Sequence, residues 1–266
     1  MNWSLDELSA LVVRKIPAFE AQVLPSIDST NSELMRRAKS GYSAPLLLVA
    51  EEQTAGKGRL GKTWHSQPGQ SLTFSIGLAL SLKDWSGFSL AVGLGILKAL
   101  DPNQQYGLGI KWPNDIWIGP THAARKLGGI LIESTISSHH NLSEDPSRYC
   151  VIGVGINVVT PKGLDLQRAA AGVLEFDSNQ SAQSVLLKVV PQIINNVIEF
   201  ESLGFAAFKD EFANYDILAG QQISMNNGLV GRACGVNARG ELMIQTTSGM
   251  VPVTSDEVSL VGFGAP

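Results

Sequence analysis

The chain has 266 residues with 44% hydrophobic content, enough for one large globular domain or for one domain with a smaller companion. The net charge of −4 excludes a general attraction to nucleic acid or anionic membranes, so any cations that matter for function must act locally. Two widely separated cysteines without metal-ligand spacing fit a reduced setting, and no apolar run approaches the ~20 residues that cross a bilayer. We therefore expect a cytoplasmic protein that is not exported and does not bind membranes.

The first predicted elements are two short helices with a strand between them. Apolar residues at helical spacing predict a helix over residues 4–15, and residues 22–27 have the pattern of a brief strand. The second helix is expected over residues 28–41, where Thr30 stands three residues before a glutamate, as in a capping box. Ser29 and Thr30 either cap this helix or present hydroxyl groups to a ligand, and the sequence favours neither role.

A basic, glycine-rich loop at residues 56–64 lies between predicted strands at residues 46–50 and 71–80. The loop contains three glycines, three cations and a tryptophan. Glycines let backbone amides approach a bound anion and cations supply the opposite charge, so the loop predicts a phosphate or carboxylate site. A basic surface loop without a ligand is the alternative.

The same loop matches the nucleotide-binding P-loop pattern from Gly56 to Thr63. That motif works only when its lysine and threonine open a helix whose N-terminus faces the phosphates. Here a turn signal that includes Pro68 and Gly69 precedes the strand at residues 71–80. We therefore favour an anion-binding loop of another fold.

The middle of the chain carries a second motif. Residues 86–100 predict a buried helix, and residues 109–118 predict a hairpin around a Trp-Pro-Asn-Asp turn. Lys111, at the end of the first hairpin strand, either belongs to an ordinary hairpin or points into a cleft. Apolar strands are expected at residues 130–133 and 149–159, and the glycines of the second offer a small-residue face to a ligand.

The second half of the chain changes from helices to short strands. Residues 137–147 predict a polar surface loop with two solvated histidines, and residues 184–203 and 205–215 predict helices with an apolar core stripe. From residue 217 onward, strands broken by Asn-Gly, Arg-Gly and Ser-Gly turns predict a small β-barrel. The domain boundary is expected within residues 214–218.

The chain lacks the usual parts of a hydrolase or a metalloenzyme. It has no Gly-x-Ser-x-Gly elbow, no His/Cys cluster with metal spacing and no obvious pair of catalytic carboxylates. Its first half instead holds cations beside glycines or turns, namely Lys57, Arg59, Lys62, Lys111, Arg125 and Lys126. Such a concentration in an acidic protein predicts a site for a polyanion such as a nucleoside triphosphate, where fixed cations and Mg²⁺ supply most of the catalysis.

Six ordered motifs together resemble those of biotin protein ligases. They are Ser-Thr-Asn at 29–31, Glu-Gln-Thr-Ala-Gly-Lys-Gly-Arg at 52–59, Gly-Lys-Thr-Trp at 61–64, Lys-Trp-Pro-Asn-Asp at 111–115, Arg-Lys-Leu-Gly-Gly-Ile-Leu at 125–131 and Gly-Val-Gly-Ile-Asn at 153–157. No single motif is specific, but their order and spacing are. The resemblance implies an α+β fold in which residues 1–215 form a mixed β-sheet catalytic domain with flanking helices, like class II synthetases. Residues 216–266 would form an SH3-like β-barrel.

The resemblance also implies a two-step ligase reaction. The carboxylate of biotin attacks the α-phosphorus of ATP, giving biotinyl-5′-AMP and pyrophosphate, and a lysine of the biotin carboxyl carrier protein of acetyl-CoA carboxylase then attacks the activated carbonyl. Adenylation is needed because a carboxylate is a poor acyl donor and AMP is a good leaving group. The implied substrates are biotin and ATP with Mg²⁺, without a tightly bound prosthetic group, and a homodimer is compatible with this family.

Roles carried over by matching position divide the predicted site into three sets. Biotin contacts would come from Ser29, Thr30, Asn31, Gln53, Lys57, Gly58, Arg59, Lys126 and Gly129. ATP or adenylate contacts would come from Gly56, Lys57, Arg59, Trp64, Lys111 and Asn157. The catalytic residues would be Arg59, Lys111 and Lys126, with Asp115 as a candidate Mg²⁺ ligand. Lys126 would hold the carboxylate and phosphate oxygens together, which reduces the repulsion between two anions.

Two departures from the family pattern stand out. The family's loop usually contains Gly-Arg-Gly-Arg, and here Lys57 replaces the first arginine, which keeps the charge but loses the planar bidentate fork. How tightly the adenylate is retained therefore stays open. Some members carry an N-terminal winged helix that represses biotin genes, and the segment before Ser29 is too short for it, so we expect no sequence-specific DNA binding.

Other functions compete with this interpretation. A lipoate protein ligase shares a related catalytic fold and the adenylate strategy, although the basic loop and the Lys-Trp-Pro-Asn-Asp motif favour biotin. A non-enzymatic nucleotide-binding module would need a helix directly after Lys62. A DNA-binding repressor is disfavoured by the short N-terminal segment and by the net negative charge.

Overall fold

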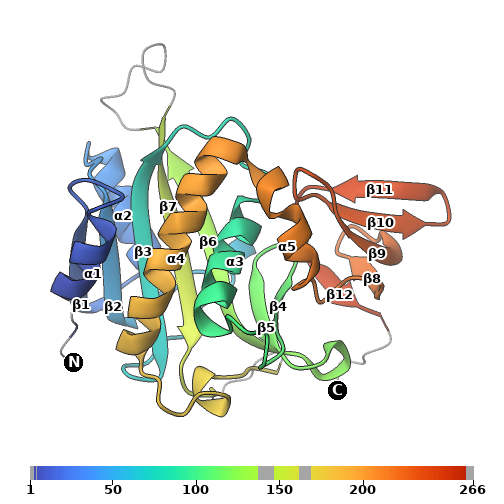
Figure 1. Cartoon of the computed structure of the whole chain (residues 1–266), viewed down its shortest axis with the longest axis horizontal. Helices are drawn as coiled ribbons and strands as arrows, with labels where there is room; N and C mark the ends of the chain where they lie inside the picture. The colour runs from blue at the N-terminus through green and yellow to red at the C-terminus, as the bar shows by residue number, and fades with distance from the viewer. Residues whose placement is uncertain (1–2, 4, 137–146, 162–168, 262–266) are drawn as a thin grey trace.

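A seven-stranded mixed sheet forms the centre of the larger part of the molecule (Figure 1). The structure is a computed structural model that describes residue 3 and residues 5–136, 147–161 and 169–261. The strands are β1 (Glu20–Ile27), β2 (Leu46–Gln53), β3 (Ser71–Leu80), β4 (Leu108–Lys111), β5 (Asp115–Ile118), β6 (Arg125–Thr135) and β7 (Arg148–Asn157). They lie in the order β1-β2-β3-β7-β6-β5-β4, with β1 and β2 parallel and the other neighbours antiparallel.

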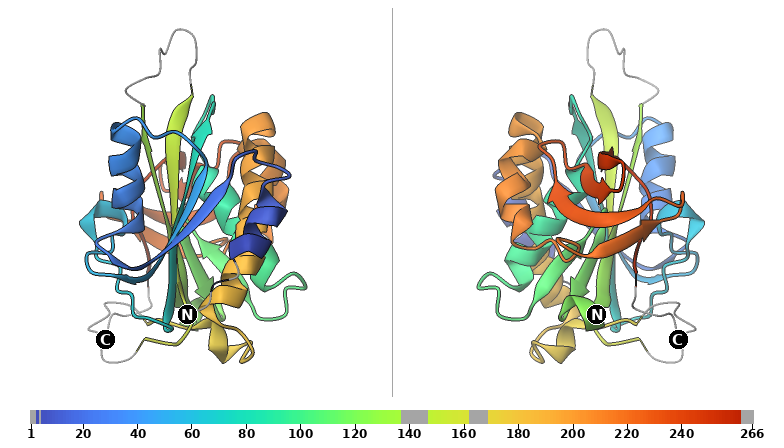
Figure 2. Two further views of the ribbon diagram at one scale, coloured as in Figure 1. Left: turned by 90° about the vertical axis from the view of Figure 1, so that its left-hand side faces the viewer. Right: turned by 90° about the vertical axis from the view of Figure 1, so that its right-hand side faces the viewer.

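Helices cover both faces of this sheet, so that it is buried on each side (Figure 2). They are α1 (Leu5–Val12), α2 (Thr30–Lys39), α3 (Phe88–Leu100), α4 (Ala182–Leu203) and α5 (Lys209–Ala213). Helices α1, α3 and α4 share the main apolar core on one face, whereas α2 packs a smaller cluster with β2 and β7 on the other. The predicted buried helix α3 packs closely against α4, since a Cβ atom at Gly95 would lie 3.0 Å from the carbonyl oxygen of Gln192.

The C-terminal part is a second sheet of five antiparallel strands, where the sequence predicts a small barrel. Its strands are β8 (Gln222–Met225), β9 (Val230–Val236), β10 (Leu242–Thr246), β11 (Gly249–Val253) and β12 (Val258–Leu260). They lie in the order β11-β10-β9-β8-β12, with Gly228, Gly240 and Gly249 at positive φ in the predicted turns. The predicted α+β architecture is therefore confirmed. None of the described helices has the length and hydropathy needed to cross a membrane.

The structure decides between the two capping candidates and corrects one strand boundary near the site. Ser29, and not Thr30, is the N-cap of α2, because its side chain accepts the backbone N–H of Ser32. Strand β6 begins at Arg125 rather than at residue 130, so its basic and glycine residues lie within a strand instead of before one. Short 3₁₀ turns occur at η1 (Arg59–Gly61), η2 (Thr121–Ala123), η3 (Val173–Glu175) and η4 (Phe205–Phe208). The predicted polar loop with His139 and His140 lies outside the described residues, except for residue 147 at its end.

Candidate active site

A cavity of about 460 Å³ lies over one end of the large sheet, and most of the predicted site residues line it. The predicted residues that line it are Ser29, Thr30, Asn31, Gln53, Lys57, Gly58, Arg59, Trp64, Lys111, Asp115, Lys126, Gly129 and Asn157. Gly56 does not line it. The backbone carbonyl of Gly56 accepts a hydrogen bond from Trp64 at 2.9 Å, and a Cβ atom there would lie 2.4 Å from the Trp64 carbonyl oxygen, so its glycine requirement is one of chain packing.

The deep end of the cavity rests on a row of residues that runs across three strands. Ser75 of β3 pairs with Gly153 of β7, which pairs with Leu131 of β6. The side chain of Asn31 lies across this row, and a Cβ atom at Gly153 would be only 2.1 Å from its Oδ1 atom. Asn31 therefore occupies the space in front of Gly153, while the small-residue face of β7 still lines the cavity through Gly153, Val154 and Gly155.

A second row, two residues along the strands, is covered by Trp64. Gly155 pairs with Gly129, and Gly129 pairs with Asp115. A Cβ atom at Gly155 would lie 2.3 Å from the indole ring of Trp64, so this glycine lets the ring lie flat against β7. The Nζ atom of Lys126 is 5.9 Å from the ring centroid. Trp64 thus forms one wall of the cavity, beside the site's cations.

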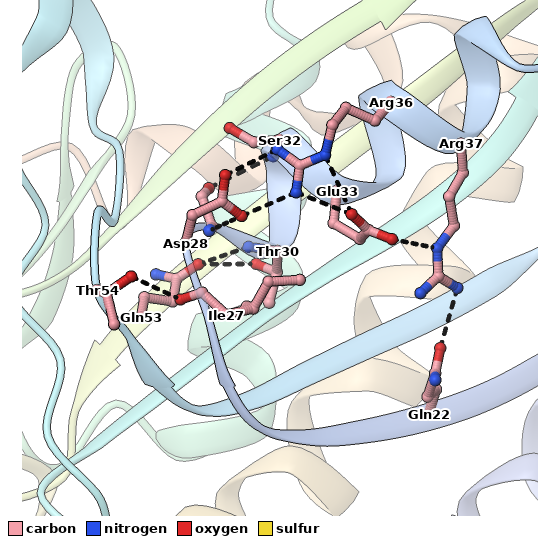
Figure 3. A network of polar contacts seen from close by, with 11 residues as sticks. Gln22, Ile27, Asp28, Thr30, Ser32, Glu33, Arg36, Arg37, Gln53 and Thr54 are labelled. Atoms are coloured by element: carbon pink, nitrogen blue, oxygen red, sulfur yellow. Dashed lines mark hydrogen bonds and ion pairs between the residues drawn. The ribbon is translucent and has the colours of Figure 1, made fainter.

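A surface network fixes the start of helix α2, which carries the Ser-Thr-Asn motif (Figure 3). Arg36 donates to Asp28 at 2.7 and 2.8 Å and to Glu33 at 2.8 Å, while Arg37 donates to Glu33 at 2.7 Å and to Gln22 at 2.9 Å. The hydrogen bond from Arg36 is the main cause that lowers the pKa of Asp28 to about 2. The network ties the helix to the end of β1, so the motif is held over the sheet.

The two hydroxyl groups of the motif have different roles in the fold. Ser29 is the N-cap, with its oxygen 3.4 Å from the backbone nitrogen of Ser32. Thr30 is turned to the sheet, where Gln53 Oε1 lies 2.8 Å from its backbone nitrogen and 3.1 Å from its hydroxyl oxygen. Both residues are buried and line the cavity, so the capping role and the ligand role do not exclude each other.

The basic loop is a tight hairpin and not a P-loop. Gly58 donates its backbone N–H to Lys62 at 2.7 Å, and Lys57 forms a bridge with Thr63. The chain after Lys62 is extended and leads to β3, without the helix that a P-loop requires. The rejection of the P-loop from sequence is confirmed.

Arg59 links the basic loop to two other walls of the cavity. Its guanidinium donates to Asn114 Oδ1 at 3.2 Å and to Ser255 Oγ at 2.9 Å. Burial lowers the pKa of Arg59, and the nearby carboxylate of Asp115 opposes this effect. A partly desolvated guanidinium interacts more strongly with an anion than an exposed one, because the local dielectric constant is lower.

The two predicted lysines are held by specific partners. Lys126 Nζ lies 2.7 Å from Asp115 Oδ1, and both line the cavity. Lys111 is buried, with its Nζ atom donating to the carbonyl oxygen of Val258 at 2.6 Å and lying 5.0 Å from the Trp117 ring centroid. The open question about Lys111 is therefore answered: it lies in the hairpin and also lines the cavity.

Asn157 and Asp115 have partners that bear on their predicted roles. Asn157 Nδ2 donates to the carbonyl oxygen of Ala171 at 3.0 Å and lies 3.4 Å from that of Lys126. The Asn157 side chain therefore braces the backbone at the cavity wall. Asp115 is paired with Lys126, and within the described part of the chain no three metal-ligating side chains cluster together.

Several residues that form or support the cavity are not among the predicted site residues. Asn114 is held by Ile130, whose carbonyl oxygen accepts from its Nδ2 at 2.7 Å. Residues 256–258 of the C-terminal part also line the cavity, although they lie far along the chain from the motifs. Ser75 and Glu133 lie below the deep end. Asn114 belongs to the Lys-Trp-Pro-Asn-Asp motif, which predicts a turn but assigns this residue no role in the site, and single polar residues in apolar strands give no signal.

Comparisons with known proteins agree with this geometry. A sequence profile of the biotin/lipoate A/B protein ligase family matches residues 23–157. A bifunctional ligase/repressor BirA of Bacillus spizizenii is 27% identical over 244 residues, which cover 88% of this chain and 72% of that protein. A biotin--[acetyl-CoA-carboxylase] ligase of Mycobacterium tuberculosis is 31% identical over 186 residues, covering 66% of this chain and 64% of that protein.

A solved structure is similar over nearly the whole chain. The biotin protein ligase from Aquifex aeolicus in complex with biotin and ATP has a TM-score of 0.74 and 27% identity, covering 91% of this chain and 98% of that one. The likeness therefore covers more of the chain than the family profile does. That profile spans half of the chain and contains all six motifs completely. The chain therefore belongs to the biotin/lipoate A/B protein ligase family.

Proposed function

We propose that this protein adenylates biotin with ATP and transfers the biotinyl group to a lysine of the biotin carboxyl carrier protein of acetyl-CoA carboxylase. The observation that carries the proposal is the polarity of the cavity. Its deep end presents uncharged hydrogen-bonding groups from Thr30, Asn31 and Gln53, whereas Arg59 and Lys126 supply cations elsewhere along its wall. A ligand with an uncharged polar ring and a carboxylate tail fits such a site.

The cations account for the first step of the proposed reaction. The carboxylate of biotin and the α-phosphate of ATP are both anionic, so their approach needs fixed positive charge. Lys126 and Arg59 are placed for this, and Lys111 would bind further phosphate oxygens. Asp115, a carboxylate that lines the cavity, would hold Mg²⁺ together with the phosphate oxygens, and the ion would supply further positive charge to the triphosphate.

The second step needs a protein nucleophile from outside the chain. The amine of the acceptor lysine attacks the carbonyl of biotinyl-5′-AMP, the amide bond forms, and AMP leaves with the bonding electrons. Trp64 lies against β7 as a flat wall, and we assign it a place beside the adenine of the nucleotide. The proposed division at residues 1–215 and 216–266 leaves the site shared, since residues 256–258 of the second part line the cavity.

A lipoate ligase is the second candidate within the same family. The deep end of the cavity argues against it, because the urea of biotin can hydrogen-bond to Thr30 and Gln53 whereas the dithiolane ring of lipoate has no N–H group. Buried polar groups left without partners disfavour the wrong ligand strongly.

The test is exchange of labelled pyrophosphate into ATP, with biotin or lipoate as the acid. We expect exchange that requires biotin, and Arg59→Ala and Lys126→Ala each to lower its rate by about 10²-fold or more. Lys188→Ala, which removes an exposed cation from helix α4, is the matched control and should retain the parent rate. Exchange driven equally by lipoate, or unaffected by both cavity variants, would refute the proposal.

A further inference from the structure

Below the deep end of the cavity, polar side chains from α2, β3 and β6 form one connected set of hydrogen bonds. Ser75 Oγ lies 2.7 Å from Thr30 Oγ1 and 2.6 Å from Asn31 Oδ1. Asn31 Nδ2 donates to Glu133 Oε2 at 2.9 Å and lies 3.3 Å from the carbonyl oxygen of Leu131. Ser75 is fully buried, and neither Ser75 nor Glu133 lines the cavity.

The carboxylate of Glu133 determines how the Asn31 amide is oriented. Glu133 and the Leu131 carbonyl are both acceptors, so the NH₂ group of Asn31 must face them. Its carbonyl oxygen then faces Ser75. The reverse orientation would place an amide oxygen against a carboxylate and a backbone carbonyl, with three acceptors and no proton between them.

Because each hydroxyl group has only one proton, the orientation of Asn31 also determines which hydrogen bond Thr30 donates. Ser75 has one proton, and Asn31 Oδ1 can only accept, so the proton of Ser75 lies in the 2.6 Å contact. The 2.7 Å contact between Ser75 and Thr30 must then contain the proton of Thr30. The longer contact, 3.1 Å between Thr30 Oγ1 and Gln53 Oε1, then contains no proton. Gln53 Oε1 still accepts a hydrogen bond from the Thr30 backbone N–H at 2.8 Å.

Thr30 consequently meets the cavity with lone pairs. A hydroxyl whose proton is donated into the protein accepts from a ligand N–H and cannot donate to a ligand oxygen. The two N–H groups of a cyclic urea are such donors. The direction is set by Glu133, two hydrogen-bonded side chains away from Thr30.

We propose that Glu133 and Ser75 are positioning residues for the urea ring of biotin, acting through Asn31 and Thr30. This inference rests on the proposed function. It makes selection of an N–H donor a property of the whole set of hydrogen bonds rather than of Thr30 alone.

Two variants from different strands test the inference. Ser75→Ala removes the hydroxyl that receives the Thr30 proton. Glu133→Gln keeps the size but supplies an NH₂ group, so Asn31 can turn over and Thr30 can point its proton at the cavity. Ser32→Ala is the matched control, because Ser32 lies on the same helix and its buried hydroxyl has no hydrogen-bond partner within the described part of the chain (Figure 3).

The readout is biotin-dependent pyrophosphate exchange, measured as separate KM values for biotin and ATP. The same assay uses a biotin analogue in which one urea N–H is replaced by CH₂, prepared as both positional isomers. We expect both variants to raise KM for biotin about tenfold or more and to keep KM for ATP within about twofold. They should also lose most of the parent's preference for biotin over one of the two isomers, and Ser32→Ala should match the parent.

The possible results separate the inference from the proposed function. If the parent shows biotin-dependent exchange but both variants retain its KM for biotin and its preference over the isomers, the inference is refuted alone. A parallel rise of both KM values would indicate general damage to the site and would also refute it. Absence of biotin-dependent exchange in the parent would refute the proposed function and this inference with it.

Discussion

Asp216 lies at the junction of the two sheets, and its burial should make the free energy of unfolding fall as pH rises. It forms a parallel bridge with Ile110 of β4, flanked by a 2.7 Å hydrogen bond from the Ile110 backbone to Tyr215. One carboxyl oxygen accepts from the Leu218 backbone at 2.9 Å, while Oδ2 is buried and has no partner within the described part of the chain. Burial raises the pKa of Asp216 to about 6.

The sign of the effect follows from the two states. The unfolded carboxyl has its ordinary pKa of 3.8, so between pH 3.8 and about 6 the folded state binds more protons than the unfolded state. Stability from Asp216 is therefore greatest below pH 3.8 and falls as pH rises through the folded pKa. A difference of about 2 pKa units corresponds to at most about 3 kcal/mol at pH 7.5. In Asp216→Asn the unpaired amide group would cost about 1 kcal/mol, leaving a net gain of about 2 kcal/mol.

Urea unfolding at pH 4.5, 6 and 7.5 tests this prediction. We expect Asp216→Asn to exceed the parent by about 2 kcal/mol at pH 7.5, with the advantage shrinking or reversing at the lowest pH. Asp210→Asn, an exposed carboxylate on the neighbouring helix α5, is the matched control. An advantage of Asp216→Asn that is the same at all three pH values would refute the reasoning, since titration of a buried carboxyl could not then be its cause.

Two further substitutions test contacts of Trp64 and Trp112. In Gly155→Ala the added Cβ atom would lie 2.3 Å from the indole ring of Trp64, so the ring should be displaced and KM for ATP should rise about tenfold or more. An unchanged KM for ATP would contradict the place of Trp64 beside the adenine. Trp112→Phe removes the 3.0 Å hydrogen bond from the Trp112 indole to the Gly240 carbonyl oxygen, so it should lower the free energy of unfolding by about 1–3 kcal/mol in urea titrations. A decrease below about 0.5 kcal/mol would contradict this expectation.

Much of the large sheet could be predicted because its strands are apolar runs bounded by turn signals. The strands at β2, β3 and β7 and the β4–β5 hairpin are confirmed. Strand β6 was predicted too short because Gly128 and Gly129 are typical of loops. In the structure a Cβ atom at Gly128 would lie 2.7 Å from the carbonyl oxygen of Gly155, so this glycine serves close strand packing.

The sequence predicts the site residues that lie in contiguous motifs. It does not predict those that only the pairing of the strands brings next to the site. The sequence identifies Thr30 and Asn31, but the residues that orient them come from two other strands. Ser75 reaches Asn31 because β3, β7 and β6 are in register and Gly153 leaves space between them. A serine inside an apolar strand and a glutamate near a strand end are too common to predict such a role.

The C-terminal sheet is part of the site, since its segment 255–258, at the start of β12, holds three of the basic residues that the sequence singles out. Ser255 accepts from Arg59 at 2.9 Å, Glu257 pairs with Lys62, and the Val258 carbonyl accepts from the buried Lys111 at 2.6 Å. Burying a lysine is costly unless its ammonium group is hydrogen-bonded, so the position of Lys111 depends on strand β12 as much as on its own hairpin. The segment 255–258 thus contacts both the basic loop and strand β4 of the hairpin. Docking of the C-terminal sheet therefore fixes the relative positions of cations that come from separate parts of the larger sheet, which is the arrangement that joining two anions requires.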